Sequence, residues 1–363
     1  MDKFSFIIHP HTLQDYICWF PFTGYLPSTI FKGVTRVLPP FKVSEIKGIQ
    51  SSFAQVEGEF VCCPLLSEQL RQLPSELVLY KIIKAVKLAE RNGAKLVGLS
   101  AFSSIMADGG KTVAKKAGIP VTTGDSYNVF MALEGLKEAA KLMEFDCSKI
   151  NVVVLGATSS IGSVCARILA GENRYLTLVD LQKSELEKLA AQILYETGLA
   201  VKVTANIKEA LRQADIVFVV TPIADAYLEI KDLKSGAVFY EIARPRNISL
   251  KIAEQRKDIL VIEGALVDVP GVPEFNFNFG FFSGKCYADM AEVMVLALEK
   301  RYESFSMGRD VTLSQVKEIG RIAKKHGFKL AGLYSSGKSI TREEIEKVKE
   351  NVHMKQKGKA RVS

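Results

Sequence analysis

Apolar runs that alternate with amphipathic segments dominate the central part of the chain. Residues 152–155 read Val-Val-Val-Leu, and residues 216–220 read Ile-Val-Phe-Val-Val. Continuous runs of β-branched residues are typical of strands buried on both faces of a parallel sheet. In 184–197 and 207–213 the apolar residues recur at helical spacing instead. Strands that alternate with helices in this way predict an α/β fold with a doubly wound parallel sheet.

The N-terminal part repeats this alternation with shorter strands. Residues 3–8 and 96–99 are expected to form strands, and 76–92 an amphipathic helix that Gly93 ends. Three further segments with helical spacing follow in the C-terminal part, at 285–303, 311–326 and 341–352.

These patterns divide the chain into two α/β domains and a tail. We expect the N-terminal part of a substrate domain in 1–130 and a dinucleotide-binding domain of Rossmann type in 131–284. Helices in 285–345 are expected to return to the substrate domain. The last residues, 346–363, are rich in lysine and are expected to form a basic, partly disordered tail.

A glycine-containing turn follows the strand at 152–155 directly. Gly156 permits a tight turn, Gly162 permits close packing of helix on strand, and the helix N-terminus between them faces a pyrophosphate. Asp180 ends the next strand, where it would accept hydrogen bonds from the adenosine ribose and repel a 2′-phosphate. We therefore expect NAD(H) to be favoured over NADP(H). The alternative to cofactor binding is that Gly156 to Gly162 form an ordinary strand-to-helix turn. The predicted cofactor-binding residues are Gly156, Ala157, Thr158, Ser159, Ser160, Ile161, Gly162, Asp180, Thr221 and Pro222.

Hydroxyl side chains follow two of the expected strands in the N-terminal part. The carboxyl ends of strands are where open α/β sheets bind ligands. These hydroxyls either hold a polar group of the substrate or cap the next helices. The candidate substrate-binding residues are Ser103, Ser104, Thr122 and Thr123.

Composition and charge restrict the classes of partner and the cellular compartment that we expect. The net charge of the 363 residues is +8, but no basic stripe with interleaved aromatics predicts nucleic-acid binding. The excess of positive charge suits an acidic partner, such as an acidic carrier protein. The six cysteines lack zinc or disulfide spacing, and no metal site is expected.

Residues 1–10 do not read as a signal peptide, and prolines interrupt the aromatic stretch 16–31, so a cytoplasmic protein without a transmembrane segment is expected. The oligomeric state stays open, a homo-oligomer included.

Taken together, several stretches resemble the acyl-[acyl-carrier-protein] reductases that form fatty aldehydes, and bacterial relatives called predicted amino acid dehydrogenases. The resemblance spans most of the chain. It is carried by Gly98 to Ser104, Thr122 to Tyr127, Val154 to Thr158 with Ile161-Gly162, Ala243 to Arg246, Phe277 to Gly280, Ala291-Glu292, Phe305 to Arg309, and His326 to Phe328.

The resemblance implies a cysteine nucleophile that takes the acyl group from a carrier thioester, after which a nicotinamide hydride releases the aldehyde. This chain departs from that pattern, because the family's nucleophile position falls on Asp289 and the nearby thiol is Cys286. Fatty-aldehyde-forming members also place a basic residue, suited to NADPH, where Asp180 stands.

Three hypotheses about the chemistry follow from this departure. Cys286, expected in the first turn of a helix, serves as a displaced nucleophile with a lowered thiol pKa. Alternatively, Asp289 serves as a charged or general-base group in an NAD-dependent dehydrogenase of a small hydroxy or amino acid. In the third, the protein binds a dinucleotide without catalysis, and Cys286 and Asp289 are structural.

Overall fold

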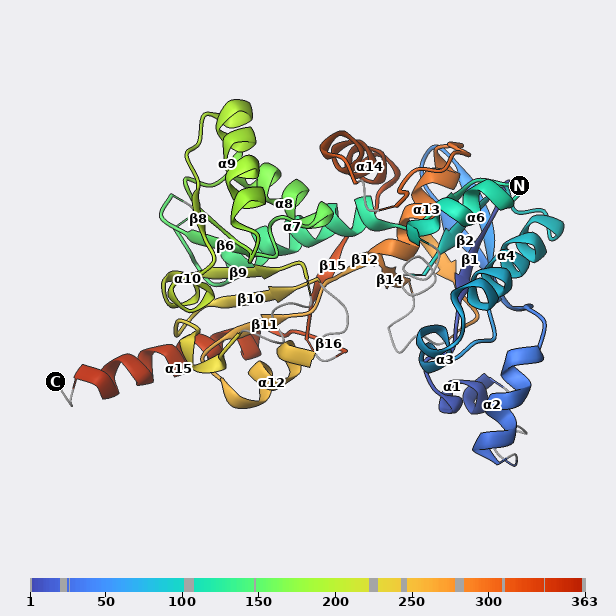
Figure 1. The fold of residues 1–363 in the computed structure, drawn as a ribbon, viewed down its shortest axis with the longest axis horizontal. Coiled ribbons are helices and arrows are strands. Elements are labelled where there is room, and N and C mark those ends of the chain that lie inside the picture. The colour runs from blue at the N-terminus through green and yellow to red at the C-terminus, as the bar shows by residue number, and fades with distance from the viewer. Residues whose placement is uncertain are drawn as a thin grey trace. The chain divides into compact units, whose positions relative to one another are not determined.

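The computed structural model describes residues 2–19, 25, 27–100, 108–146, 148–221, 228–242, 247–277, 284–308, 311–335 and 337–360. The chain forms two compact units (Figure 1). Unit 1 consists of Met1–Asn128 and Val267–Lys329, and unit 2 of Val129–Leu266 and Leu330–Ser363. The chain therefore passes from one unit to the other three times.

A six-stranded sheet forms the centre of unit 2, in the order β11-β10-β9-β6-β7-β8. All its neighbouring strands are parallel. Its strands are β6 (Asn151–Leu155), β7 (Tyr175–Val179), β8 (Lys202–Thr204), β9 (Ile216–Val219), β10 (Val238–Glu241) and β11 (Leu260–Ile262). Strand order reverses between β6 and β9, which is the arrangement of a Rossmann-type sheet. The predicted fold class is confirmed.

Helices cover both faces of this sheet (Figure 1). They are α7 (Asp125–Leu142), α8 (Ser160–Ala170), α9 (Lys183–Thr197), α10 (Ile207–Gln213) and α12 (Asn247–Gln255). Side chains of α10 and α12 pack with Val153, Val217 and Phe239 in one core cluster. On the other face, Gly135 of α7 leaves room for the ring of Tyr240, whose hydroxyl would lie 2.5 Å from a Cβ there. Alternate residues of each strand thus serve opposite faces.

Unit 1 has its own six-stranded sheet, in the order β13-β2-β3-β1-β4-β5. Its strands are β1 (Asp2–Ile8), β2 (Phe41–Gln50), β3 (Gln55–Cys62), β4 (Leu96–Leu99), β5 (Val121–Thr122) and β13 (Gly271–Glu274). β3, β1, β4 and β5 run parallel, and β2 and β13 add antiparallel strands at one edge. The carboxyl ends of the parallel strands therefore meet at one edge of the sheet.

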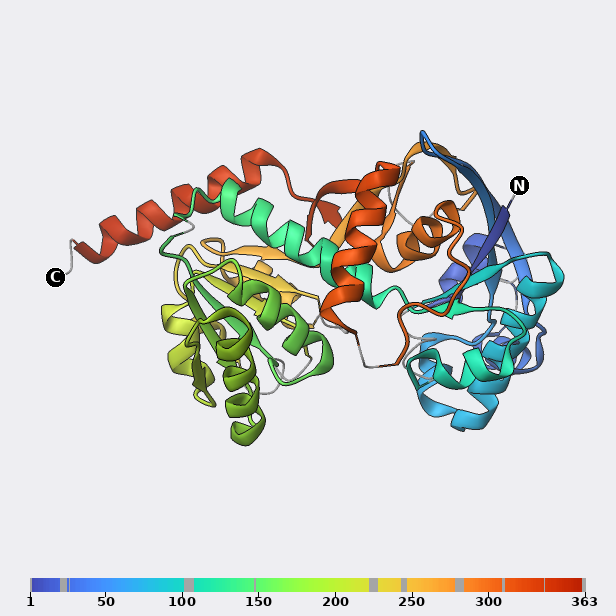
Figure 2. The same cartoon turned by 90° about the horizontal axis from the view of Figure 1, so that it is seen from above.

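Two helices cover opposite faces of this second sheet. α4 (Ser75–Arg91) packs on Ile7, Val97 and their neighbours, while Gly98 faces Val293 of α13 (Ala288–Leu298). Ten of the eleven residues of α13 are buried, as expected for a helix that is apolar all round. The other helices of unit 1 include α1 (Leu13–Trp19), α2 (Ser28–Val37), α3 (Ser67–Gln72), α6 (Lys111–Lys116) and α14 (Leu313–His326), the last of which is seen best from above (Figure 2).

The structure differs from the expected organisation around residue 285. Instead of a helix over 285–303, a strand β14 (Lys285–Tyr287) precedes α13. Gly284 has a positive φ of 85°, and Tyr287 is extended, with φ −68° and ψ 151°. The backbone therefore becomes helical only at Ala288.

The boundaries of the two units also differ from expectation. Unit 2 ends at Leu266 rather than 284, because β13 pairs with β2 of unit 1, Gly271 opposite Ile49. After Lys329 the chain belongs to unit 2 again, through β15 (Lys329–Ser335), β16 (Lys338–Ser339) and α15 (Arg342–Ala360).

The tail, expected to be partly disordered, is helical as far as Ala360. Two of its lysines form ion pairs, Lys349 with Glu144 at 2.6 Å and Lys355 with Asp258 at 2.9 Å. Ile345 on the same helix is 3% exposed. These contacts anchor α15. The prediction of partial disorder rested on lysine content alone, which does not indicate such contacts. Within the described ranges, no helix combines the length and apolar character needed to cross a membrane.

Candidate functional site

The glycine turn between β6 and α8 is packed so tightly that both glycines are required. Gly156 has φ 86°, and a Cβ there would lie 1.4 Å from Cγ2 of Thr221. A Cβ on Gly162 would lie 2.2 Å from the carbonyl oxygen of Gly156. Thr221, expected beside the cofactor, thus packs against the turn, and Pro222 lies outside the described residues.

Ser159 takes the place where a third glycine often stands in this motif. Its hydroxyl accepts a hydrogen bond from the Gly162 N–H at 3.1 Å and donates one to the Gly156 carbonyl oxygen at 2.8 Å. Ser159 is thereby the N-cap of α8. Residues 158–161 are partly exposed, so a ligand can approach this end of the helix. The donor set and the open N-terminus fit the pyrophosphate of a dinucleotide.

Asp180 lies beside the turn, as expected, but its carboxylate is already engaged. It is 7% exposed and accepts hydrogen bonds from the Thr158 N–H at 3.2 Å and the Thr158 hydroxyl at 2.7 Å. Its second oxygen accepts from the Leu181 N–H at 2.7 Å. A carboxylate has about four acceptor positions. One position is therefore left for a ribose hydroxyl.

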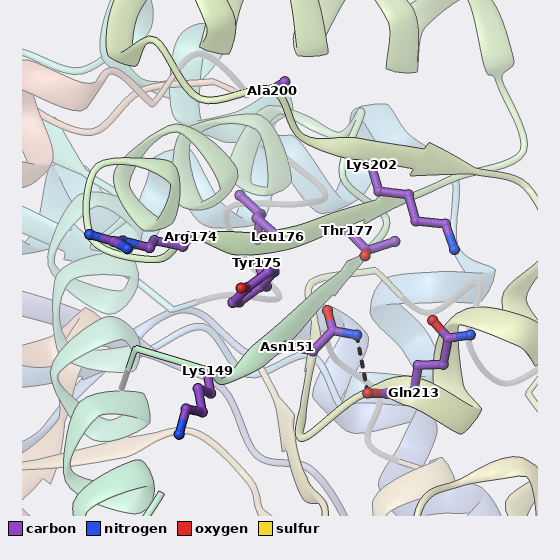
Figure 3. A pocket seen from close by; sticks show the side chains of 9 residues that line it. All are labelled: Lys149, Asn151, Arg174, Tyr175, Leu176, Thr177, Ala200, Lys202 and Gln213. Atoms are coloured by element: carbon purple, nitrogen blue, oxygen red, sulfur yellow. Dashed lines mark hydrogen bonds between the residues drawn. The ribbon is translucent and has the colours of Figure 1, made fainter. Parts of the chain in front are cut away.

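A pocket of about 470 Å³ lies at the amino-terminal ends of β6, β7 and β8 (Figure 3). Tyr175 and Asn151 stand at the first residues of their strands, and Asn151 Nδ2 donates to the Gln213 carbonyl oxygen at 3.1 Å. This is the sheet edge opposite to the glycine turn. Because open α/β sheets bind their ligands at the carboxyl ends of strands, we do not include this pocket in the candidate site.

In unit 1, the hydroxyls predicted to hold substrate bind carboxylates of the protein. Thr122 Oγ1 donates to Glu292 Oε1 at 2.5 Å, and Thr123 Oγ1 donates to Asp125 Oδ2 at 2.8 Å. Both threonines are buried. Ser103 and Ser104 lie outside the described residues. The two threonines therefore position acids in this structure, a role that the sequence pattern did not indicate.

Glu292 is a fully buried carboxylate on α13 that holds three segments of unit 1 together. It accepts from the hydroxyls of Thr122 and Ser306 and from the Tyr127 N–H, at 2.5, 3.0 and 2.9 Å. Burial raises the pKa of Glu292, and these hydrogen bonds oppose that rise. Apart from the Ala291-Glu292 block of the resemblance, no feature of the sequence predicts this network.

Asp125 begins α7 directly after this network and is the titratable group best suited to proton transfer. Burial raises its pKa to about 7, the hydrogen bond from Thr123 opposes the rise, and the charges of Glu292 and Asp289 add to it. A carboxyl with a pKa near neutrality can both give and take a proton at physiological pH. Asp125 is not among the site residues predicted from the sequence, although an acid after Thr-Thr-Gly at a strand end is the signal that marks it.

Asp289 lies in the first turn of α13, and its Oδ1 accepts from the Met290 N–H at 2.9 Å. Gly124, with φ 82°, allows this approach, because a Cβ there would lie 2.4 Å from the Cα of Asp289. Asp289 is partly exposed. The structure thus brings Asp289 next to the loop that carries Asp125.

The prediction that Cys286 lies in the first turn of a helix and has a lowered thiol pKa is wrong. Cys286 lies on β14 rather than in the first turn of α13, and it is 1% exposed. Burial raises its thiol pKa well above the ordinary value, and Asp289 and Asp268 raise it further. The helix dipole therefore does not activate this thiol. Among the described residues, no group of three or more His, Cys, Asp or Glu side chains is arranged to hold a metal ion.

Comparison with known proteins finds one matching family model and relatives of low identity. The model of the shikimate / quinate 5-dehydrogenase family matches residues 137–263. The long-chain acyl-[acyl-carrier-protein] reductase of Synechococcus elongatus is 25% identical over 312 residues, 80% of this chain and 87% of that protein. The resemblance to the acyl-carrier-protein reductases is thereby confirmed.

A second relative is a longer protein. The aminotransferase PigE of Serratia sp. is 28% identical over 366 residues, which cover 97% of this chain. The chain spans only 42% of the length of PigE. Among solved structures, L-tryptophan dehydrogenase from Nostoc punctiforme matches 98% of this chain and 88% of its own, with 15% identity and a TM-score of 0.40.

Proposed function

We propose that this protein is a nicotinamide-dependent oxidoreductase that transfers hydride directly, without a covalent intermediate, to or from a small hydroxy or amino acid. The observation that carries the proposal is the position of Asp125, which follows the Gly124 turn packed against Asp289 and accepts a hydrogen bond from Thr123. Burial raises the pKa of Asp125 to about 7. In reduction, Asp125 donates its proton to the oxygen of the C=O bond or the nitrogen of the C=N bond that is reduced. In oxidation, it accepts the proton from the corresponding hydroxyl or amine. The bound nicotinamide supplies or receives the hydride.

The residue at the family's nucleophile position supports direct transfer. Asp289 is a poor acceptor of an acyl group from a thioester, because the resulting anhydride is less stable than the thioester. Cys286 is buried and its thiol pKa is raised. Nucleophilic catalysis requires the thiolate, which is scarce when the pKa is high.

For the cofactor we propose the glycine turn as the pyrophosphate site and NAD(H) as the favoured form. Asp180 carries its negative charge next to the turn and is held there by Thr158. A 2′-phosphate would meet a charge of the same sign, whereas a ribose hydroxyl can donate to the remaining acceptor position.

The second candidate is reduction of an acyl thioester, carried on coenzyme A or on an acidic acyl carrier protein, to an aldehyde. The similarity to the reductase of Synechococcus elongatus over 80% of this chain favours it. The net charge of +8 is suited to an acidic carrier. In this case hydride would reach the thioester carbonyl, and the released thiolate would take its proton from Asp125.

Purified protein incubated with NADH or NADPH tests both candidates. The first panel contains 2-oxo acids with and without ammonium, and the second contains acyl-coenzyme A thioesters, for which both aldehyde and free thiol are measured. Turnover of the first panel alone supports direct transfer to a small acid. Aldehyde and thiol in equal amounts from the second would replace the first proposal by the second candidate.

A pair of variants ties turnover to the site. Asp125→Asn should lower kcat at least 100-fold while cofactor binding stays unchanged, because it removes the exchangeable proton. Glu76→Gln, at an exposed acid on α4 of the same unit, is the control and should leave kcat unchanged. Equal rates for Asp125→Asn and the wild type would overturn the role of Asp125.

A further inference from the structure

Helix α2 carries two apolar faces, one that is buried and one that is exposed among the described residues. The inner face bears Phe31, 6% exposed, whose ring meets that of Tyr16 edge-on at 5.0 Å. The outer face bears Ile30, Val34 and Val37, which are 57%, 37% and 77% exposed. The spacing i, i+4, i+7 aligns these three side chains along one stripe of the helix.

Polar contacts on the inner side hold the stripe in this outward orientation. Thr35, fully buried, donates to Gln69 Oε1 at 2.9 Å, and Gln69 Nε2 donates to the Lys32 carbonyl oxygen at 2.7 Å. Lys32 forms an ion pair with Glu68 at 2.9 Å. α2 is therefore fixed to α3 through one side, and rotation of the stripe into the core would break all of these bonds.

One cation beside the stripe is not neutralised by an acid among the described residues. Lys32 pairs with Glu68, and Lys42 pairs with Glu45 at 2.6 Å. Arg36 forms no such pair with a described residue. Arg36 is exposed on α2, and Tyr25, 89% exposed, lies just before the helix.

We propose that α2 is a contact site for the surface of a bilayer that contains anionic lipids. An apolar stripe with an exposed arginine beside it is suited to a helix that lies in the plane of the membrane interface. A protruding row of aliphatic side chains needs no matching cavity in a fluid surface, and Arg36 is attracted to anionic headgroups. The stripe inserts among the acyl chains near the headgroups, while unit 1 stays in water.

Flotation with vesicles tests this proposal. The full chain should float with vesicles of phosphatidylcholine and phosphatidylglycerol and less with phosphatidylcholine alone. Val37→Gln should lower the bound fraction at least five-fold, whereas Val272→Gln should leave it unchanged. Val272 is a fair control because it is 80% exposed in the same unit but lies on β13, away from α2. Arg36→Gln should weaken binding to the anionic vesicles about five-fold, the effect expected from about one kcal/mol per cation near the surface.

Two further measurements make the outcome decisive. The emission of Trp19, the only tryptophan of the chain, provides an independent binding titration at the end of α1. Sedimentation of the wild type and of Val37→Gln tests whether the stripe joins two copies instead. Three outcomes would each overturn the proposal. The full chain does not float with the vesicles, or Val37→Gln and Val272→Gln lower the bound fraction equally, or the wild type is a dimer that Val37→Gln dissociates.

Discussion

Thr158 donates two hydrogen bonds to the carboxylate of Asp180, one from its backbone N–H at 3.2 Å and one from its hydroxyl at 2.7 Å. These bonds connect the acid after β7 to the glycine turn after β6. A ribose hydroxyl that donates to Asp180 would therefore bind the same carboxylate that holds Thr158 of the glycine turn in place. The position of the turn and the choice of cofactor are coupled through this pair.

The first prediction concerns that choice. The wild type should bind NADH at least ten-fold more tightly than NADPH, because a 2′-phosphate would face the Asp180 carboxylate. Asp180→Ser should reduce the preference to about three-fold or less. Thr158→Val, which keeps the charge and removes one of the two bonds, should keep the preference. Calorimetric titration of both cofactors decides the matter, and tighter binding of NADPH by the wild type would contradict it.

The second prediction uses the close contact under Gly162. Gly162→Val should abolish cofactor binding without unfolding the chain, and even Gly162→Ala should weaken it at least ten-fold. The reason is that a Cβ would lie 2.2 Å from the Gly156 carbonyl oxygen, so the turn must move. Gly171→Ala at the other end of α8 is the control, since its Cβ would be 3.4 Å from the nearest atom. If both Gly162 variants retained wild-type affinity and fold, the turn would not be the cofactor site.

The third prediction follows from the raised pKa of Asp125. Its pKa in the folded state is about 7 against an ordinary 3.8, so the folded state holds a proton that the unfolded state has lost. Stability should therefore fall as pH rises from about 4 to 7 and level off above that. Asp125→Asn should flatten this part of the profile in urea unfolding. A wild-type profile equal to that of Asp125→Asn would show that Asp125 titrates normally.

The fourth prediction separates the two routes of acyl chemistry. Cys286→Ser should leave turnover of the native substrate unchanged, because the buried thiol takes no part in direct hydride transfer. Asp289→Cys should create an acyl-enzyme adduct with acyl-coenzyme A, since it places a thiol at the partly exposed position that the related reductases use. Mass spectrometry of the modified peptide is the readout. An adduct on Cys286 in the wild type would refute direct transfer.

The fifth prediction concerns Glu292 as a structural acid. Glu292→Gln should destabilise the chain by about 3 kcal/mol, because the amide group cannot accept all the hydrogen bonds that the carboxylate accepts. The exposed Glu76→Gln on α4 should change the free energy of unfolding by less than about 0.5 kcal/mol. Urea unfolding at pH 7 measures both, and similar values for the two variants would contradict the role of Glu292.

The Rossmann-type sheet was predictable because its strands are buried on both faces. Runs such as 152–155 carry no polar residue, and the helices between them have clear periodicity, so each local signal agrees with the fold. Helix α10 is found at the residues expected, Ile207–Gln213. The glycine turn was readable for the same reason, since its spacing follows from the packing that Gly156 and Gly162 permit.

The acidic site in unit 1 was only partly predictable. Asp289 emerged by comparison with a family pattern. The pKa of Asp125 is raised chiefly by burial, and the charges of Glu292 and Asp289, which lie far away in sequence, add to the rise. Cys286 was misplaced because Lys-Cys-Tyr fits both a short strand and the start of an apolar helix. Three residues are too few for periodicity to decide, and the positive φ of Gly284 is not visible in the sequence.

The three passages of the chain between units bear on its synthesis. Met1–Asn128 emerges from the ribosome before the other segments described here, yet the α13 side of its sheet is completed only after all of Val129–Leu266 has been made. The nascent N-terminal segment therefore exposes an apolar sheet face while the continuous Rossmann-type segment folds behind it. Chains stalled or cleaved before residue 288 would carry that open face, and they are natural clients for chaperones that bind extended apolar surface.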